Sequence, residues 1–363
     1  MPTVAGWIYT HDGFTEGAVT FQDGAITDVT EDVEGDVLAK GIILPGFVNA
    51  HTHLGDAVVL EEPRGTLEEV VAPPDGLKFR WLKAASQEEL TAAMRNVLER
   101  AVRAGTTSCV DFREGGLPGL AALREASSGL PIEVAALGRP LGLQYDEDEV
   151  AGLLKLADGV GASGLSDWES GPLADLARHV SRNGLLFSLH ASEAFREDID
   201  AILDLKPDFL VHMTAGRRSD WERCAEEDIP VAISPRSQVF FGRVPDIPGM
   251  HEAGIRLMLG TDNAMIAHPS LLREMEFAYQ VAKLHRGVPP EAILAMAYEG
   301  ANLLTGPSRM AIQEGAPCNF LVLDLPWGGN AAYRVIKASE ADINLLVVGS
   351  QVWDRKRGWL PED

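Results

Sequence analysis

Residues 45–53 read Pro-Gly-Phe-Val-Asn-Ala-His-Thr-His, and the pattern of the chain changes at this stretch. Before it, short apolar segments are separated by Asp12-Gly13 and Asp23-Gly24, dipeptides typical of hairpin turns. After it, apolar strands alternate with amphipathic helices. Because parallel neighbours need a crossover connection, usually a helix, this alternation predicts a parallel sheet.

The second part of the chain contains eight apolar strands, most of them followed by a helix. The strands are expected at 48–50, 106–112, 132–137, 159–165, 185–189, 209–211, 230–233 and 256–259. Helices are expected at 87–103, 117–126, 173–182, 220–227, 271–284 and 291–304, with a long loop at 61–74 that is either a lid or a solvated segment. Eight such units favour an α/β fold with a closed, TIM-like (β/α)₈ barrel over an open sheet. Further strands, at 319–323, 343–348 and 351–353, are expected to pair with the N-terminal strands in one small β domain.

Composition and charge restrict the possible partners. The chain has 363 residues, 46% of them apolar, and its net charge is −23. Such a charge repels a nucleic-acid backbone. No apolar run of about 18 residues and no basic stretch leading into an apolar segment occurs, so neither a membrane partner nor secretion is expected. We expect a cytoplasmic protein that acts on a small molecule; homo-oligomers are possible.

Side chains able to bind a metal follow several of these strands. His51 and His53 are two residues apart at the end of the first strand, where both side chains point to the same side. His190, His212 and Asp262 end the fifth, sixth and eighth strands. A single histidine of this kind can be a hydrogen-bonded core residue. Five such residues at convergent strand ends, however, predict a metal site, and nitrogen and oxygen ligands without a thiolate favour zinc, with iron or manganese as alternatives.

The order and spacing of these residues resemble the amidohydrolase superfamily over nearly the whole chain. The resemblance rests on residues 45–53, on His190 and His212, and on Gly260-Thr261-Asp262. Residues 315–322 and the N-terminal turns also resemble the composite β-sandwich that flanks the barrel in this superfamily. The resemblance therefore implies a metal-dependent hydrolase barrel at 46–305 and a composite β-sandwich formed by residues 1–45 and 306–363.

The resemblance also implies a metal site. His51, His53, His190 and Asp262 would bind one divalent ion, and His212 would lie beside the activated water and the substrate. Binuclear members carry a carboxylated lysine at the end of the fourth strand. Residues 158–165 contain no lysine, so a mononuclear site is expected.

The sequence His190-Ala191-Ser192-Glu193 resembles the deaminase branch of the superfamily, which includes cytosine, guanine and S-adenosylhomocysteine deaminases and has chlorohydrolase relatives. Water attack on an amidine-like ring carbon requires protonation of a ring nitrogen and later of the leaving amine. Glu193 is expected to carry that proton while Asp262 accepts the proton of the water. The alternative for Glu193 is a place in the first turn of the next helix, where acids are favoured.

The sequence thus predicts a hydrolase of non-peptide carbon–nitrogen bonds, a deaminase of an aminated heterocycle such as a purine, pyrimidine or nucleoside derivative. One alternative is a hydrolase that cleaves an amide or carbon–chlorine bond with the same site. Another is a non-catalytic scaffold of the same fold, which should lack one or more of the metal ligands. All of them are present here.

Three arginines follow strands on the side where barrel active sites form. They are Arg113, Arg139 and Arg236, after the second, third and seventh strands. Because guanidinium groups bind carboxylate and phosphate well, a cluster of them predicts an anionic group on the substrate. Salt bridges to Asp111 and Glu114 are the alternative, and they would leave a neutral heterocycle as the expected substrate.

Overall fold

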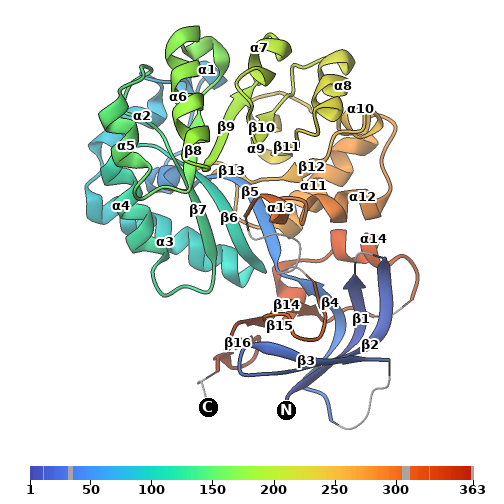
Figure 1. Cartoon of the computed structure of the whole chain (residues 1–363). Helices are drawn as coiled ribbons and strands as arrows, with labels where there is room; N and C mark the ends of the chain where they lie inside the picture. Colours follow the sequence, from blue (N-terminus) through green and yellow to red (C-terminus); the bar gives the residue numbers. More distant parts are fainter. Residues whose placement is uncertain (11, 32–35, 305–310, 327, 361–363) are drawn as a thin grey trace.

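A computed structural model describes residues 1–360 except 11, 32–35, 305–310 and 327. It shows two parts: a barrel surrounded by helices and, below it, a smaller β domain that contains strands from both ends of the chain (Figure 1). No helix among the described residues is long and apolar enough to cross a membrane.

The barrel is a ring of parallel strands, as predicted. Its strands are β5 (Phe47–His53), β6 (Thr106–Arg113), β7 (Glu133–Gly138), β8 (Gly159–Ala162), β9 (Leu186–Ala191), β10 (Phe209–His212), β11 (Val231–Ile233), β12 (Leu257–Leu259) and β13 (Asp262–Asn263). Residues 257–263 close the ring, since β12 pairs with β11 and β13 pairs with β5. Between them, Gly260 N–H donates to the Ile233 carbonyl at 2.9 Å and Thr261 N–H to the His51 carbonyl at 3.1 Å.

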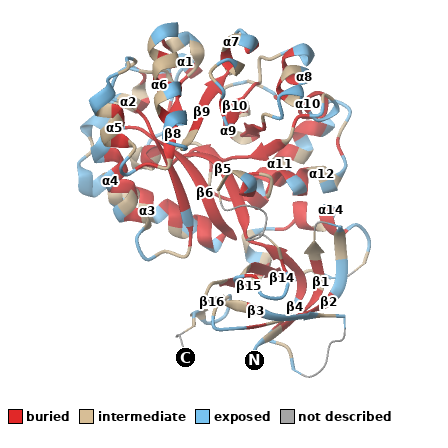
Figure 2. Cartoon of the chain, viewed as in Figure 1, coloured by how far each residue is buried: buried red, intermediate tan, exposed pale blue. Residues whose placement is uncertain are grey.

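Helices cover the outside of the barrel and leave its strands buried (Figure 2). They are α3 (Gln87–Arg103), α4 (Gly116–Ser127), α5 (Glu147–Leu153), α6 (Ser170–Arg182), α7 (Ile199–Leu203), α8 (Arg218–Glu226), α9 (Pro235–Phe240), α10 (Ile247–Glu252), α11 (Leu271–Lys283), α12 (Pro290–Met296) and α13 (Ala301–Leu304). The start of α3 at its predicted residue is fixed by a capping box between Ser86 and Glu89.

The structure corrects three expectations about individual elements. The single helix expected at 291–304 is wrong: it is split into α12 and α13, because the Ala297 carbonyl accepts a hydrogen bond from Val48 N–H of the barrel at 2.9 Å. The fourth strand ends at Ala162, and residues 165–167 form the 3₁₀ helix η2. The segment after β5 is not one long loop. It contains η1 (Leu54–Val58), α1 (Leu67–Val71) and α2 (Leu77–Ala84).

The small domain is one sheet built from both chain ends. It contains β1 (Thr3–Thr10), β2 (Gly13–Gln22), β3 (Ala25–Thr30), β4 (Ala39–Pro45), β14 (Asn319–Leu323), β15 (Ile343–Val348), β16 (Gln351–Asp354) and β17 (Gly358–Trp359), in the order β17-β16-β15-β14-β4-β1-β2-β3. The antiparallel pair β4–β14 joins the two ends. The sheet bends over its own core, so the rings of Phe21 and Phe320 are 5.3 Å apart although two strands separate β2 from β14.

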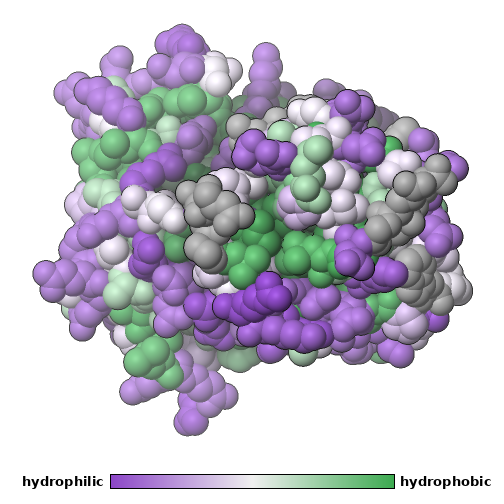
Figure 3. Space-filling model, turned by 90° about the horizontal axis from the view of Figure 1, so that it is seen from below, coloured by the Kyte–Doolittle hydropathy of each residue, from purple (hydrophilic) through white to green (hydrophobic). Residues whose placement is uncertain are grey.

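The expected small β domain is therefore confirmed as part of the fold. Its boundaries at 45/46 and 305/306 stay predictions, and residues 305–310 lie outside the described part of the chain. Seen from below, polar side chains cover most of the surface and apolar ones gather near its middle (Figure 3). The short helices α14 (Ala331–Ile336) and η4 (Glu340–Asp342) lie between β14 and β15 in the chain.

Candidate active site

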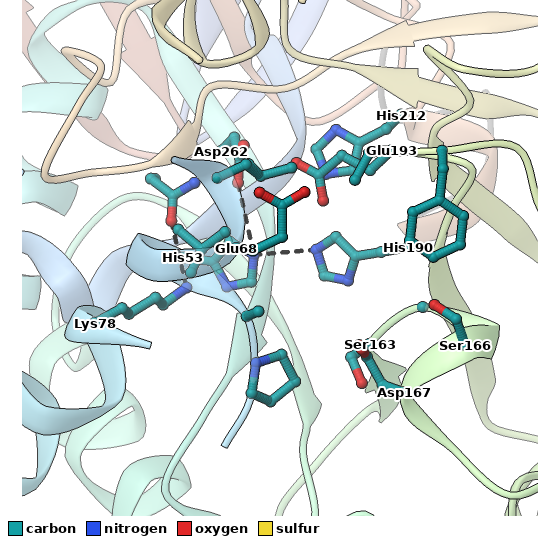
Figure 4. Close-up of a pocket in the computed structure, with 18 of the residues that line it drawn as sticks. His53, Glu68, Lys78, Ser163, Ser166, Asp167, His190, Glu193, His212 and Asp262 are labelled. Carbon is teal, nitrogen blue, oxygen red and sulfur yellow. Dashed lines mark hydrogen bonds and ion pairs between the residues drawn. The ribbon is translucent and has the colours of Figure 1, made fainter. Parts of the chain in front are cut away.

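Five buried side chains meet where the barrel strands end. His51 and His53 come from β5, His190 from β9, His212 from β10 and Asp262 from β13 (Figure 4 labels all but His51). They form two groups in which the possible ligand atoms lie within 4.8 Å of one another, namely His51-His53-His190 and His51-His212-Asp262. The barrel thus brings together the five residues that the sequence placed at strand ends.

The backbone is strained at this end of the strands. Ser192, His212 and Asp262 have positive φ angles of 44°, 76° and 57°. Residues other than glycine rarely adopt this region, and each such position costs roughly 1–3 kcal/mol. Strain of this kind is common at functional sites, where it turns a side chain toward the site rather than along the strand.

The hydrogen bonds of two histidines fit a bound cation. His53 Nδ1 lies 3.2 Å from the Phe112 carbonyl and His190 Nδ1 lies 2.9 Å from the Ala162 carbonyl. Because a carbonyl only accepts, each Nδ1 carries the proton and each Nε2 presents a lone pair. These two Nε2 atoms face each other at 3.2 Å, an unfavourable contact unless a cation lies between them. Two nitrogens bound to one tetrahedral zinc ion lie roughly 3.3–3.4 Å apart.

The surroundings of His51 also fit a bound cation. Both of its ring nitrogens are buried and have no hydrogen-bond partner among the described residues. Its Nε2 lies 3.3 Å from Asp262 Oδ1. The donor set of three imidazoles and one carboxylate, without a thiolate, suits a divalent ion such as zinc.

The protonation states also suit metal binding. Burial lowers the pKa of His51 to about 3, and burial together with the neighbouring imidazoles lowers the pKa of His190 well below its usual value. Both rings are therefore neutral at pH 7, the form that binds metals. Burial alone would raise the pKa of Asp262, but its interactions with His51, His212 and His53 hold it well below its usual value. Ser237 Oγ donates to Asp262 Oδ2 at 2.7 Å, which leaves Oδ1 facing the histidines.

Glu193 is not part of a helix, since it lies in the segment between β9 and α7. Its Oε1 is 3.4 Å from His212 Nε2, and burial raises the pKa of its carboxyl group although His212 opposes the shift. Glu197 holds this segment in place by accepting hydrogen bonds from Ser192 N–H at 2.7 Å and Ser166 N–H at 2.8 Å. Glu193 is thus a positioned carboxylate with an increased tendency to hold a proton.

A cavity of about 120 Å³ opens beside these residues. Its wall includes His53, His190, Glu193, His212 and Asp262. On another side it is formed by α1 and the residues after it, so residues 61–74, expected as a lid or a solvated loop, contribute directly to the pocket. Figure 4 shows Glu68 of α1 close to the metal-binding side chains and Asp167 below them.

Of the three arginines expected at the substrate, only one reaches the cavity. Arg139 lies in its wall, with Nη1 3.5 Å from Glu114 Oε1. Arg113 is buried and pairs with Glu114 at 2.6 Å and with Asp111 at 3.2 Å, the salt bridges considered as the alternative. Arg236 pairs with the buried Glu274 at 2.6 Å and donates to the His268 carbonyl at 2.6 Å. The structure therefore does not bring the three guanidinium groups together.

Sequence reasoning missed Lys78, a buried residue in the cavity wall. It belongs to α2, in a stretch where no helix was expected, and its Nζ lies 2.7 Å from Glu114 Oε1. Glu114 in turn is 2.8 Å from His53 Nδ1 and was considered only as a partner of the arginines. The start of an amphipathic helix after the Asp75-Gly76 turn is the one signal that pointed to α2.

Comparisons with known proteins agree with this geometry. A family model described as "Amidohydrolase family" matches residues 42–352. A putative aminohydrolase of Methanothermobacter thermautotrophicus is 32% identical, with 92% of this chain and 94% of that protein covered. A 5-methylthioadenosine/S-adenosylhomocysteine deaminase of Bacillus cereus is 27% identical, with coverages of 88% and 84%.

Solved structures share the fold at low sequence identity. The zinc complex of atrazine chlorohydrolase from Arthrobacter aurescens has a TM-score of 0.78 at 20% identity, with 99% of this chain and 96% of that chain covered. Guanine deaminase from C. acetobutylicum, with guanine bound, has a TM-score of 0.74 at 15% identity, with coverages of 96% and 99%.

Proposed function

This chain belongs to the amidohydrolase family and is a hydrolase of carbon–nitrogen bonds; from that premise we propose that it is a mononuclear, metal-dependent deaminase of an aminated heterocycle, such as a purine, pyrimidine or nucleoside derivative. The observation that carries the proposal is the position of Glu193. This carboxyl group, whose pKa is raised by burial, lines the cavity in contact with His212 and close to Asp262.

We assign the metal to His51, His53, His190 and Asp262, whose donor atoms and protonation states fit a divalent ion. When bound, such an ion lowers the pKa of a water molecule toward 7 and so provides a nucleophile at neutral pH. Zinc is the preferred candidate because of the nitrogen and oxygen donors, with iron and manganese as alternatives. Strand β8, where binuclear members of the superfamily carry a carboxylated lysine, contains no lysine in this chain. Its sequence therefore supports a site with one metal ion rather than two.

The chain's own residues account for the proton transfers. Asp262 accepts the proton of the attacking water, and the hydrogen bond from Ser237 Oγ to its Oδ2 fixes the orientation of the carboxylate. Glu193 delivers a proton to the ring nitrogen next to the reacting carbon, and His212 holds Glu193 in place. Asp262 passes the proton taken from water to the amine as the carbon–nitrogen bond breaks, and Glu193 regains a proton from the new hydroxyl group. Ammonia leaves, and the ring carbon carries oxygen in place of nitrogen.

The position of Glu193 also separates the proposal from its alternatives. An amine is a poor leaving group until it is protonated, whereas chloride leaves without a proton. A carboxyl group with a raised pKa, facing the cavity, therefore favours amine release over cleavage of a carbon–chlorine bond. The complete set of metal-binding residues argues against a non-catalytic scaffold.

A substrate panel tests the proposal. Protein stripped with a chelator and reloaded with zinc is incubated with adenosine, 5-methylthioadenosine, S-adenosylhomocysteine, guanine, cytosine and a chlorotriazine, and ammonia and chloride are measured. We expect ammonia in equal amount to the oxygenated product from at least one amine, loss of this activity in the stripped protein and recovery with zinc. Chloride release without ammonia would favour the chlorohydrolase alternative, and no product from any amine would contradict the proposal.

A further inference from the structure

We propose that Lys78 binds the substrate and determines its specificity, by donating a hydrogen bond to an acceptor atom on the ring edge that lies away from Glu193. The inference rests on the proposed function and adds to it a residue and a substrate feature. It depends on the burial of Lys78, on its incomplete set of partners and on its place relative to Glu193.

Lys78 lies at the start of α2, and only 2% of its surface is exposed. Its ammonium group has three N–H donors, all of which need acceptors when it is buried. Glu114 Oε1 lies 2.7 Å from Lys78 Nζ, whereas Asn263 Oδ1 lies at the longer distance of 3.4 Å from it. Asp56 Oδ2 is 3.7 Å away, beyond hydrogen-bond distance. A buried ammonium group with one short contact, in the wall of a cavity, has room for another acceptor.

The carboxylate that neutralises Lys78 is shared with other groups. Glu114 Oε1 also lies 2.8 Å from His53 Nδ1 and 3.5 Å from Arg139, and Glu114 Oε2 pairs with Arg113. Asp56 is the other carboxylate near Lys78, but its Oδ2 lies 3.7 Å from Nζ, and burial raises the pKa of its carboxyl group. Glu114 is therefore the one carboxylate among the described residues within hydrogen-bond distance of Lys78 Nζ, and Lys78 and Arg139 both line the cavity wall.

The position of Lys78 indicates which part of the substrate it meets. Figure 4 shows Lys78 entering beside His53, whereas Glu193 and His212 lie on the other side of Asp262. A ring whose reacting carbon faces the metal ligands has one flank toward Glu193, which protonates its nitrogen. The opposite flank then faces Lys78 and Asn263.

Ring chemistry then distinguishes possible substrates. In a 6-aminopurine, the flank opposite the protonated N1 carries N7, an acceptor for the Lys78 ammonium group. In cytosine, the corresponding position is a C–H group, which accepts nothing. The geometry thus points to a 6-aminopurine ring whose N7 accepts a hydrogen bond from Lys78.

Paired ligands that differ only at N7 test this inference. Adenosine is compared with 7-deazaadenosine by kcat/KM, and the products inosine and 7-deazainosine are compared by equilibrium dialysis, which needs no turnover. Loss of a hydrogen bond to a charged donor should weaken kcat/KM and binding by about 10- to 100-fold for the deaza compounds. In Lys78→Met this difference should disappear, while in Lys78→Arg part of it should remain.

Lys83→Met is the matched control, because Lys83 is an exposed lysine of the same helix. It should keep the full preference for N7. Metal content and melting temperature are measured for each variant, and a Lys78→Met protein that does not fold is replaced in the comparison by Lys78→Gln. Equal binding of the paired ligands to the unmodified protein, or no binding of either, would overturn the inference. A preference in binding without any deamination would instead overturn the proposed function and leave the role of Lys78 standing.

Discussion

Glu193→Gln keeps the size of the side chain but removes its capacity to carry a proton. Glu193 Oε1 lies 3.4 Å from His212 Nε2, and the side chain of Glu193 is 22% exposed. A contact of this kind at a partly exposed position contributes less than about 1 kcal/mol to stability. The fold and the metal site should therefore survive the substitution.

The effect on the reaction should be much larger. A positioned acid or base contributes typically about 10²- to 10⁴-fold to the rate, so kcat of Glu193→Gln is expected to fall by that factor. This corresponds to an increase of roughly 3–5 kcal/mol in the activation free energy. Since the variant still offers a hydrogen bond at the same place, KM should change by less than about tenfold.

The assay is continuous measurement of ammonia release, together with metal analysis of the purified protein. Glu68→Gln is the matched control: Glu68 lines the same cavity, but its side chain is 57% exposed and its Oε1 lies 3.9 Å from Arg243 Nη2. This control should keep its rate within a few-fold. An unchanged kcat in Glu193→Gln would refute the proton-transfer role, and a loss of metal would show that Glu193 is a ligand.

Four further variants test the site and its surroundings. His190→Ala and Asp262→Ala should each abolish both metal retention and turnover, and full metal occupancy in either would contradict the ligand assignment. Ser237→Ala removes the hydrogen bond to Asp262 Oδ2 and should weaken metal affinity by about 10- to 100-fold in a chelator competition; an unchanged affinity would show that Asp262 needs no such support. Burial raises the pKa of Asp56 from 3.8 to about 7, so the folded state holds a proton that the unfolded chain loses and stability falls as pH rises through this window. Unfolding by urea is measured at pH 5 and at pH 8. Between these two values Asp56→Asn should lose less stability than the unmodified protein, by up to about 2.5 kcal/mol, and equal losses would contradict the shift.

The residues at the ends of the barrel strands were predictable from the sequence. Each of His190, His212 and Asp262 follows a short apolar run, and His51 and His53 have the spacing of a strand. Because parallel strands of a barrel direct their carboxyl ends to one mouth, a linear pattern was enough to bring them together. Local signals also sufficed for α3, whose capping box is visible in the sequence.

The remaining features depend on contacts between distant parts of the chain. Lys78 reaches the cavity because α2 packs against the barrel mouth; the sequence carries a signal for the helix but none for the place where it packs. Arg236 pairs with Glu274, 38 residues later in the chain. The sequence therefore did not show that this arginine would be paired outside the pocket. The interruption between α12 and α13 arises because the Ala297 carbonyl accepts a hydrogen bond from Val48 N–H of β5, a strand that is distant in the sequence. Tertiary contacts override local patterns at all three places.

The central claim, deamination that depends on one metal ion, is tested most directly by titrating zinc into stripped protein while ammonia release is measured. The account predicts that activity is absent without metal, rises linearly and reaches its plateau at one equivalent of zinc per chain. A plateau at two equivalents would contradict the mononuclear site, and ammonia release that does not depend on metal would contradict the mechanism itself.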